Sequence, residues 1–128
     1  MKKIFLIVFV LFTLLSCEGQ QQNANYGLVS PAQLEQVMES HKNLLLIDVR
    51  TPGEYAGGKI GNAQNIDVQS PAFLEKIKNL DKDSEYAVYC AVGKRSAYAV
   101  DKMKSLGFTK VYDLQGGYYA WMNQMKKR

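Results

Sequence analysis

The sequence is poor in histidine and cysteine. Its 128 residues include one histidine, His41, and two cysteines, Cys17 and Cys90. His41 falls at the end of a predicted helix, where a lone histidine more often interacts favourably with the helix dipole than acts as a general base. A reactive thiol in this chain must therefore be activated by something other than histidine.

Long apolar runs and concentrated positive charge are also missing. The apolar run at residues 4–15 has only twelve members, whereas a membrane-spanning helix needs about 20. The net charge is +4, and the one basic run is Lys126-Lys127-Arg128 at the C-terminus. A nucleic-acid-binding protein would show a concentrated basic face, so no nucleic-acid partner is predicted.

The first 17 residues predict an export signal. Two lysines precede the apolar run, and the Leu-Leu-Ser-Cys sequence that ends at Cys17 resembles a bacterial lipobox, in which the cysteine becomes the acylated first residue. Residues 18–25 are rich in Gln and Asn and predict a flexible tether, with the folded domain at 26–128. We expect a bacterial, membrane-anchored lipoprotein that faces the periplasm or the cell surface. Secretion without lipid and an uncleaved anchor are the alternatives.

Lipidation of Cys17 would leave Cys90 as the only free thiol of an exported protein, which makes it a candidate for reactive chemistry. Cys90 follows the apolar run 86–89 and precedes a helical pattern at 97–106. The backbone N–H groups of such a loop and of the following helix N-terminus converge on one point and favour an anion there. The alternative is a buried structural thiol, which fits poorly with a loop that contains several cations.

Predicted strands and helices alternate along the whole chain. A capping box with a proline starts the first helix at Ser30, and Gly107 is predicted as the left-handed cap of the third. Helical patterns cover residues 31–41, 71–80, 97–106 and 118–125, with a short capped helical turn at 51–55 that begins at Thr51. Strands are predicted at 44–47, 63–68, 86–89 and 111–112. This alternation predicts an α/β fold with a mainly parallel sheet.

Charged residues follow two of the predicted strands. Asp48 and Arg50 come directly after the strand 44–47, and Lys94 and Arg95 come soon after Cys90. Parallel strands end at one edge of a sheet, where open α/β proteins bind their ligands. Cations and a helix N-terminus lower the pKa of a thiol from about 8.5 into the range of roughly 3.5 to 7.5. We therefore predict a thiolate at Cys90 with an anion site beside it.

One segment resembles a nucleotide-binding motif but does not complete it. Residues 53–59 match the start of a phosphate-binding P-loop, but Ile60 follows where a magnesium-binding Ser or Thr is required. The glycine pair Gly57-Gly58 also ends a helical turn instead of opening one. No nucleotide, other cofactor or metal is predicted.

Several spaced motifs run in order through the predicted domain. They are residues 46–55, 58–63 with Asn65-Ile66, 89–96, 106–108 and 111–117 with Trp121. Together they resemble a single-domain rhodanese over residues 30–121. The resemblance implies a rhodanese-like fold with a five-stranded, mainly parallel sheet and helices on both faces. It also implies a sulfurtransferase, whose cysteine accepts a sulfane sulfur as a persulfide and passes it to a nucleophile.

The resemblance also assigns roles to residues. It makes Cys90 the sulfur carrier, and it gives the substrate-binding cradle to Ala91, Val92, Gly93, Lys94, Arg95 and Ser96. Arg95 is expected to close the loop by pairing with Asp48 or Glu54. Lys94 and Arg50 are expected to face the substrate, but an arginine that is fully paired inside would leave Lys94 as the main contact. The implied partners are small sulfur-containing anions such as thiosulfate or a persulfide, and a thiol of an acceptor protein is a further candidate.

The sequence departs from the family pattern at one motif, and the length of its cysteine loop bears on the alternative functions. Gly58-Lys59-Ile60 stands where the family usually has Gly-His-Ile, and we expect altered surface contacts without loss of activity. The loop from Cys90 to Arg95 has six residues, as in sulfurtransferases, whereas related phosphatases and arsenate reductases on this fold have one more. The main alternative is a lipid-tethered module that binds a partner, or relays persulfide or redox equivalents, with little turnover of its own.

Overall fold

The computed structural model describes residues 25–128. The predicted signal peptide, the lipidation site Cys17 and the tether up to residue 24 lie outside the described residues. Strands and helices alternate strictly in the part that is described. The elements are β1 (Asn25–Val29), α1 (Pro31–Ser40), β2 (Leu45–Asp48), α2 (Pro52–Ala56), β3 (Gln64–Asn65), α3 (Phe73–Lys78), β4 (Glu85–Tyr89), α4 (Lys94–Ser105), β5 (Lys110–Leu114) and α5 (Gly117–Met125).

The five strands form one sheet in the order β1-β5-β4-β2-β3, and all neighbouring strands are parallel. This confirms the predicted α/β class and the five-stranded sheet. Strand β1 has no counterpart among the strands predicted from apolar runs, because its large aliphatic residues, Leu28 and Val29, stand only at its end. Asn25, predicted to belong to the tether, instead pairs with Lys110 at the start of β1.

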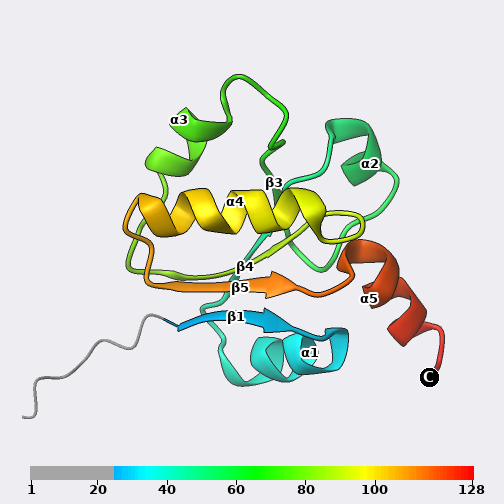
Figure 1. The fold of residues 1–128 in the computed structure, drawn as a ribbon. Helices are drawn as coiled ribbons and strands as arrows, with labels where there is room; N and C mark the ends of the chain where they lie inside the picture. The colour runs from blue at the N-terminus through cyan, green and yellow to red at the C-terminus, as the bar shows by residue number, and fades with distance from the viewer. Residues whose placement is uncertain (1–24) are drawn as a thin grey trace, which may run out of the picture.

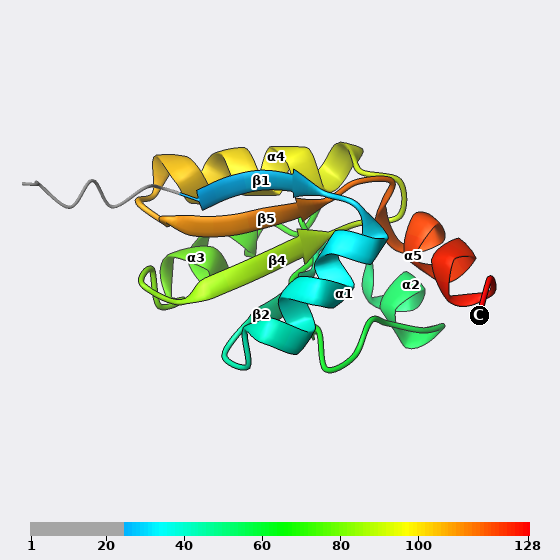
Figure 2. The ribbon, with the colours of Figure 1, turned by 90° about the horizontal axis from the view of Figure 1, so that it is seen from below.

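Helices cover both faces of the sheet, as Figures 1 and 2 show from two directions. On one face α3 and α4 bury Phe73, Ile77 and Met103 against the strands. On the other face Leu34 of α1 is buried, and Trp121 of α5 packs against the same cluster. The helices α2 and α5 lie beyond the arrowheads of the strands (Figure 1), so they flank the edge at which the strands end.

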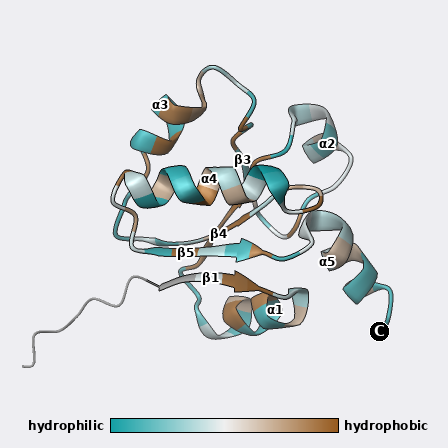
Figure 3. Ribbon diagram, in the orientation of Figure 1, coloured by the Kyte–Doolittle hydropathy of each residue, from teal (hydrophilic) through white to brown (hydrophobic). Residues whose placement is uncertain are grey.

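The central strand β4 is buried on both of its faces, and this orients Cys90. Side chains alternate along a strand: Tyr86 and Val88 face the α3 and α4 core, whereas Ala87 and Tyr89 face the α1 and α5 core. Cys90 continues the first series and is part of the same core. Figure 3 shows the mixed hydropathy colouring of α4, whose buried residues are Ser96, Ala99, Val100 and Met103.

The predicted helix caps are present. Ser30 and Gln33 form a reciprocal capping box at α1, and Thr51 and Glu54 form another at α2. After α4, Gly107 has a φ of 94°, and Phe108 N–H donates to the Met103 carbonyl at 3.1 Å. Both observations match a glycine-capped helix C-terminus.

Two elements are shorter than predicted. The strand expected at 63–68 is reduced to β3, although Ile66 and Val68 still donate their N–H groups to the carbonyls of Asp48 and Val49. Helix α3 begins at Phe73 because Ser70 forms a turn first: its carbonyl accepts from Phe73 N–H at 3.0 Å. Among the helices of residues 25–128, none has the length and apolar character that crossing a membrane would require.

Candidate active site at the end of the central strand

The loop after β4 folds around the sulfur of Cys90. Gly93 has a φ of 109° and is the N-cap of α4, and its N–H donates to Cys90 Sγ at 3.0 Å. Cys90 Sγ lies 3.5 Å from Ser96 Oγ, in the first turn of the helix. Both Cys90 and Ser96 are fully buried. The sulfur therefore sits at the positive end of a twelve-residue helix, as predicted.

The environment of Cys90 favours its thiolate. Burial by itself raises the pKa of the Cys90 thiol, but hydrogen bonds from the Ser96 hydroxyl and from the N–H groups of Ser96, Gly93 and Val92 outweigh burial and lower the pKa below its ordinary value. A thiolate is the nucleophilic form of cysteine. The site can therefore supply a nucleophile without a histidine, and His41 instead pairs with Glu85 at another part of the sheet.

Arg95 ties the loop to α2. Its guanidinium makes a bidentate pair with Glu54, with Nη1–Oε1 at 2.7 Å and Nη2–Oε2 at 3.0 Å. This pair, together with the capping bonds from Thr51, lowers the pKa of Glu54 to about 2. Of the two partners predicted for Arg95, the structure has Glu54 and not Asp48.

Arg50 is buried and paired inside the protein. Its Nη2 lies 2.6 Å from Asp48 Oδ2 and donates to the Gly58 carbonyl at 2.6 Å. The ring of Tyr118 covers the guanidinium, with 4.1 Å from Cζ to the ring centroid. Arg50 is only 4% exposed, which fits the alternative that an internally paired arginine leaves Lys94 as the main anion contact. It is the arginine paired inside, because Asp48 precedes it by two residues and α5 closes over it. Lys94 is the exposed cation of the loop.

Helix α5 holds the loop from its other side, which sequence reasoning missed. Tyr118 N–H donates to the Cys90 carbonyl at 2.7 Å, and Tyr119 N–H donates to the Ala91 carbonyl at 3.2 Å. Gly117 has a φ of 61°, and a Cβ there would lie 2.5 Å from the Cys90 carbonyl oxygen. The glycine pair at 116–117 was the available signal, since only glycine permits so close an approach with this backbone.

The two other motifs belong to α2 and the residues directly after it. Gly57 is the C-cap of α2, so the glycine pair of the incomplete P-loop motif does end a helix. Lys59, in the position where the family usually has histidine, is exposed and donates to the Tyr55 hydroxyl at 3.1 Å. Within residues 25–128, no group of three or more His, Cys, Asp or Glu side chains could hold a metal.

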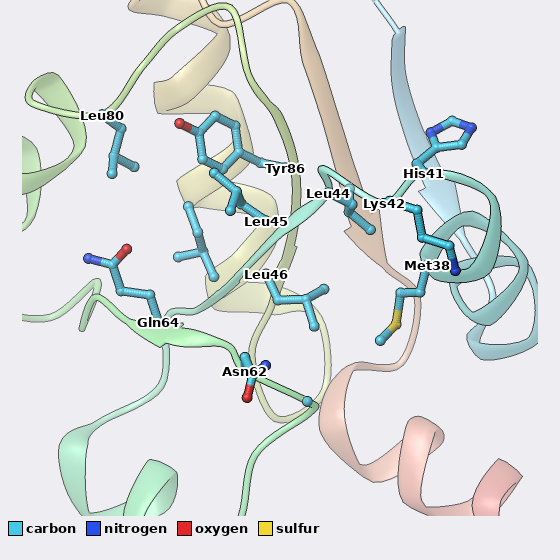
Figure 4. Close-up of a pocket in the computed structure, with 12 residues that line it drawn as sticks. Met38, His41, Lys42, Leu44, Leu45, Leu46, Asn62, Gln64, Leu80 and Tyr86 are labelled. Atoms are coloured by element: carbon cyan, nitrogen blue, oxygen red, sulfur yellow. The ribbon is translucent and has the colours of Figure 1, made fainter.

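Cavities in the described part of the chain lie away from Cys90. One of about 500 Å³ lies beside the start of β2 and is lined by side chains such as Met38, Leu44, Leu46 and Tyr86, none of them from the Cys90 loop (Figure 4). A second cavity, of about 270 Å³, lies between β1 and α4. Its lining residues are Gly27, Leu28, Ala97, Val100, Asp101, Lys104 and Asp113.

The chain is similar in sequence and in structure to known proteins. Residues 30–124 match the family model of the rhodanese-like domain. The chain is 36% identical over 105 residues to MoeZ of Mycobacterium tuberculosis, covering 82% of this chain but only 27% of that protein. It is 34% identical over 89 residues to the thiosulfate sulfurtransferase GlpE of Pseudomonas putida, covering 68% of this chain and 79% of that protein. The crystal structure of a rhodanese-related protein from Thermoplasma volcanium is similar with a TM-score of 0.68 and 36% identity, and the match covers 77% of this chain and 93% of that one.

Proposed function

Because the chain belongs to the rhodanese-like domain family, we propose that it is a sulfurtransferase that carries a sulfane sulfur on Cys90. The donor is thiosulfate or a persulfide, and the acceptor is a thiophilic nucleophile. One observation carries the proposal: a buried thiol with a lowered pKa accepts hydrogen bonds from loop amides at a helix N-terminus. Such a site supplies both a nucleophile and a place for an anion.

The first half-reaction loads the sulfur. The Cys90 thiolate attacks the outer sulfur of thiosulfate, a new S–S bond forms, and the S–S bond of thiosulfate breaks. Sulfite leaves with the bonding electron pair, so a thiolate and a thiosulfate dianion become a persulfide anion and a sulfite dianion. Lys94 is exposed at the loop and attracts the dianionic donor. Because Cys90 is fully buried, the donor must be small at its reacting end and the loop must open to admit it.

The loop amides stabilise the charge of the intermediate. The N–H groups of Val92, Gly93 and Ser96, which favour the Cys90 thiolate, offer hydrogen bonds to the anionic persulfide in the same pocket. Donors fixed in place before the reaction stabilise developing charge without reorganisation. In the second half-reaction the acceptor, for example cyanide or a thiolate, attacks the terminal sulfur, and Cys90 leaves as the thiolate.

A single-turnover assay tests the proposal. Thiosulfate in excess over the protein should release sulfite in proportion to the protein present, before any acceptor is added. Cys90→Ser should release none, whereas Ser105→Ala, an exposed serine at the far end of α4, should behave as the wild type. If no sulfane donor releases its leaving group with the wild type, the chain is not a sulfurtransferase.

The exposed rim of the loop favours a second candidate, a module that presents the persulfide to a partner protein. Val92 is 60% exposed and Tyr119 is 62% exposed, and both adjoin Ala91, whose carbonyl accepts from Tyr119 N–H. Exposed aromatic and aliphatic side chains are typical of protein contacts. In this case Val92→Ser with Tyr119→Ser should slow transfer to a protein thiol but not to cyanide. If the double variant transfers sulfur to the protein thiol as fast as the wild type does, the rim has no role in the transfer.

Export and lipidation at Cys17 are a separate proposal that the sequence pattern supports. The full-length protein produced in a bacterium should partition into detergent, and Cys17→Ala should move it to the aqueous phase. Equal partitioning of the two proteins would contradict lipidation.

A further inference from the structure

Of the three cations predicted for the site, two are neutralised by carboxylates. Arg50 and Arg95 each form an ion pair, with N–O distances of 2.6 and 2.7 Å. The hydrogen bonds with Glu54 raise the pKa of Arg95, and the charge of Asp67 adds to this effect. Lys94 is exposed, and its side chain has no hydrogen bond or ion pair among residues 25–128. An anion at the loop therefore meets one unneutralised cation of the three.

The rim of the same loop is apolar. Among residues 25–128, seven large apolar side chains are exposed. Four of them belong to the Cys90 loop or to the two helices that begin beside it, namely Val92, Tyr98, Tyr119 and Met122. The first turns of α4 and α5 lie at the same end of the sheet (Figure 1). Tyr119 N–H donates to the Ala91 carbonyl at 3.2 Å, and Met122 follows on the same side of α5 as Tyr119.

The depth of the sulfur divides a donor into two parts. Cys90 is fully buried, so only a terminal sulfur atom of the donor can reach it. The rest of the donor stays at the rim, beside the exposed side chains of Val92 and Tyr119. Thiosulfate places a doubly charged, hydrated ion against these apolar side chains, and removing water from charge is costly. A donor with an apolar group instead removes apolar surface from water at the same place.

We propose that Val92 and Tyr119 determine donor specificity, and that the preferred donor is a sulfane compound with a single negative charge and an apolar organic group. Lys94 meets the charge, and the rim contacts the organic group. With an organic thiosulfonate, the Cys90 thiolate attacks the terminal sulfur, a new S–S bond forms, and the S–S bond of the donor breaks. Sulfinate leaves with the bonding electron pair, so two singly charged anions become a persulfide anion and a sulfinate anion. This donor preference rests on the proposed function and adds the class of donor to it.

Two donors that differ only in their organic group test the preference. Methanethiosulfonate and benzenethiosulfonate carry the same charge. With cyanide as acceptor, kcat/KM for the donor reports only the loading of Cys90, because the two half-reactions are separate. The full-length chain with Cys17→Ala is used, so that Cys90 is its only thiol. After correction for the rates of both donors with a small thiol in solution, it should prefer benzenethiosulfonate about tenfold, the lower end of the range for apolar contacts.

Variants of the rim locate the preference. Val92→Ser with Tyr119→Ser should reduce it to below about threefold, because the apolar contacts are lost. Leu74→Ser removes an exposed apolar side chain from α3 and should leave the preference unchanged. Val92→Lys adds a second cation in place of an apolar side chain. It should lower the ratio of kcat/KM for benzenethiosulfonate to kcat/KM for thiosulfate about tenfold.

The outcomes separate this proposal from the proposed function. Equal kcat/KM for the two thiosulfonates, which needs no variant, would overturn the proposal and leave sulfur transfer intact. A preference that survives the loss of both rim side chains would also overturn it. The same holds if the rim variants load sulfur as the wild type does and slow only the transfer to a protein thiol, because the rim then binds a partner protein. If no donor loads Cys90, the proposed function itself fails.

Discussion

The Cys90 loop is held between two helices in different ways. On the α2 side, one ion pair between Arg95 and Glu54 makes the contact, and its side chains are 25% and 34% exposed. On the α5 side, backbone hydrogen bonds to Cys90 and Ala91 do so, above the buried pair of Asp48 and Arg50, whose side chains are 0% and 5% exposed. We infer that the α5 side fixes the fold of the site, and that the α2 side adjusts the loop.

Removal of the buried carboxylate should have the largest effect. Asp48→Asn leaves the Arg50 guanidinium buried without a counter-charge, and this typically costs about 3–5 kcal/mol of unfolding free energy. Chemical denaturation of the wild type and the variant measures the difference. A loss below about 1 kcal/mol, the value typical of exposed ion pairs, would show that the two sides of the loop are not different in kind.

Gly117→Ala should have the next largest effect. The φ of 61° and the close approach to the Cys90 carbonyl oxygen should cost about 2 kcal/mol and displace the loop, so that sulfite release slows as well. Gly53→Ala is the matched control, because a Cβ at Gly53 meets nothing within 4 Å. Equal stability of the two variants would mean that α5 does not hold the loop closely.

Glu54→Gln should affect stability least. The ion pair is partly exposed, so its loss should cost below about 1 kcal/mol. The loop should nevertheless become more mobile, and the rate of persulfide formation should fall more than stability does. Parallel measurements of denaturation and single-turnover rate on this variant and on Asp48→Asn separate the two roles. A rate as fast as that of the wild type would remove the functional role of the α2 side.

The ion pair between Arg95 and Glu54 predicts a small pH dependence of the stability of the folded chain. The pKa of Glu54 is lowered to about 2 in the folded chain, mainly by the hydrogen bond from Arg95, and it is about 4.3 in an unfolded chain. The contribution of Glu54 to stability is therefore complete above pH 4.3 and is lost as the pH falls toward 2. The difference between wild type and Glu54→Gln should be present at pH 6 and close to zero at pH 2. A difference that does not change with pH would contradict the ion pair.

Local sequence rules predicted much of this fold. Ser30, Thr51 and Gly107 act within one or two helical turns, and each has the predicted role at a helix end. Strand β1 was missed because a short edge strand carries little apolar pattern. Its position depends on pairing with β5, more than 80 residues later in the sequence.

The features of the site also divide into those that follow from neighbouring residues and those that depend on distant ones. The place of Cys90 before a helix N-terminus follows from residues that adjoin it. The burial of Arg50 does not, because it depends on Tyr118 from α5.

The central claim is that Cys90 carries the transferred sulfur. Intact mass spectrometry after incubation with thiosulfate, followed by peptide mapping, tests it directly. We predict a gain of one sulfur atom, located on the peptide that contains Cys90, removed by cyanide or a reducing thiol, and absent in Cys90→Ser. An unchanged mass with thiosulfate and with low-molecular-weight persulfides, or a sulfur that remains in Cys90→Ser, would contradict the claim.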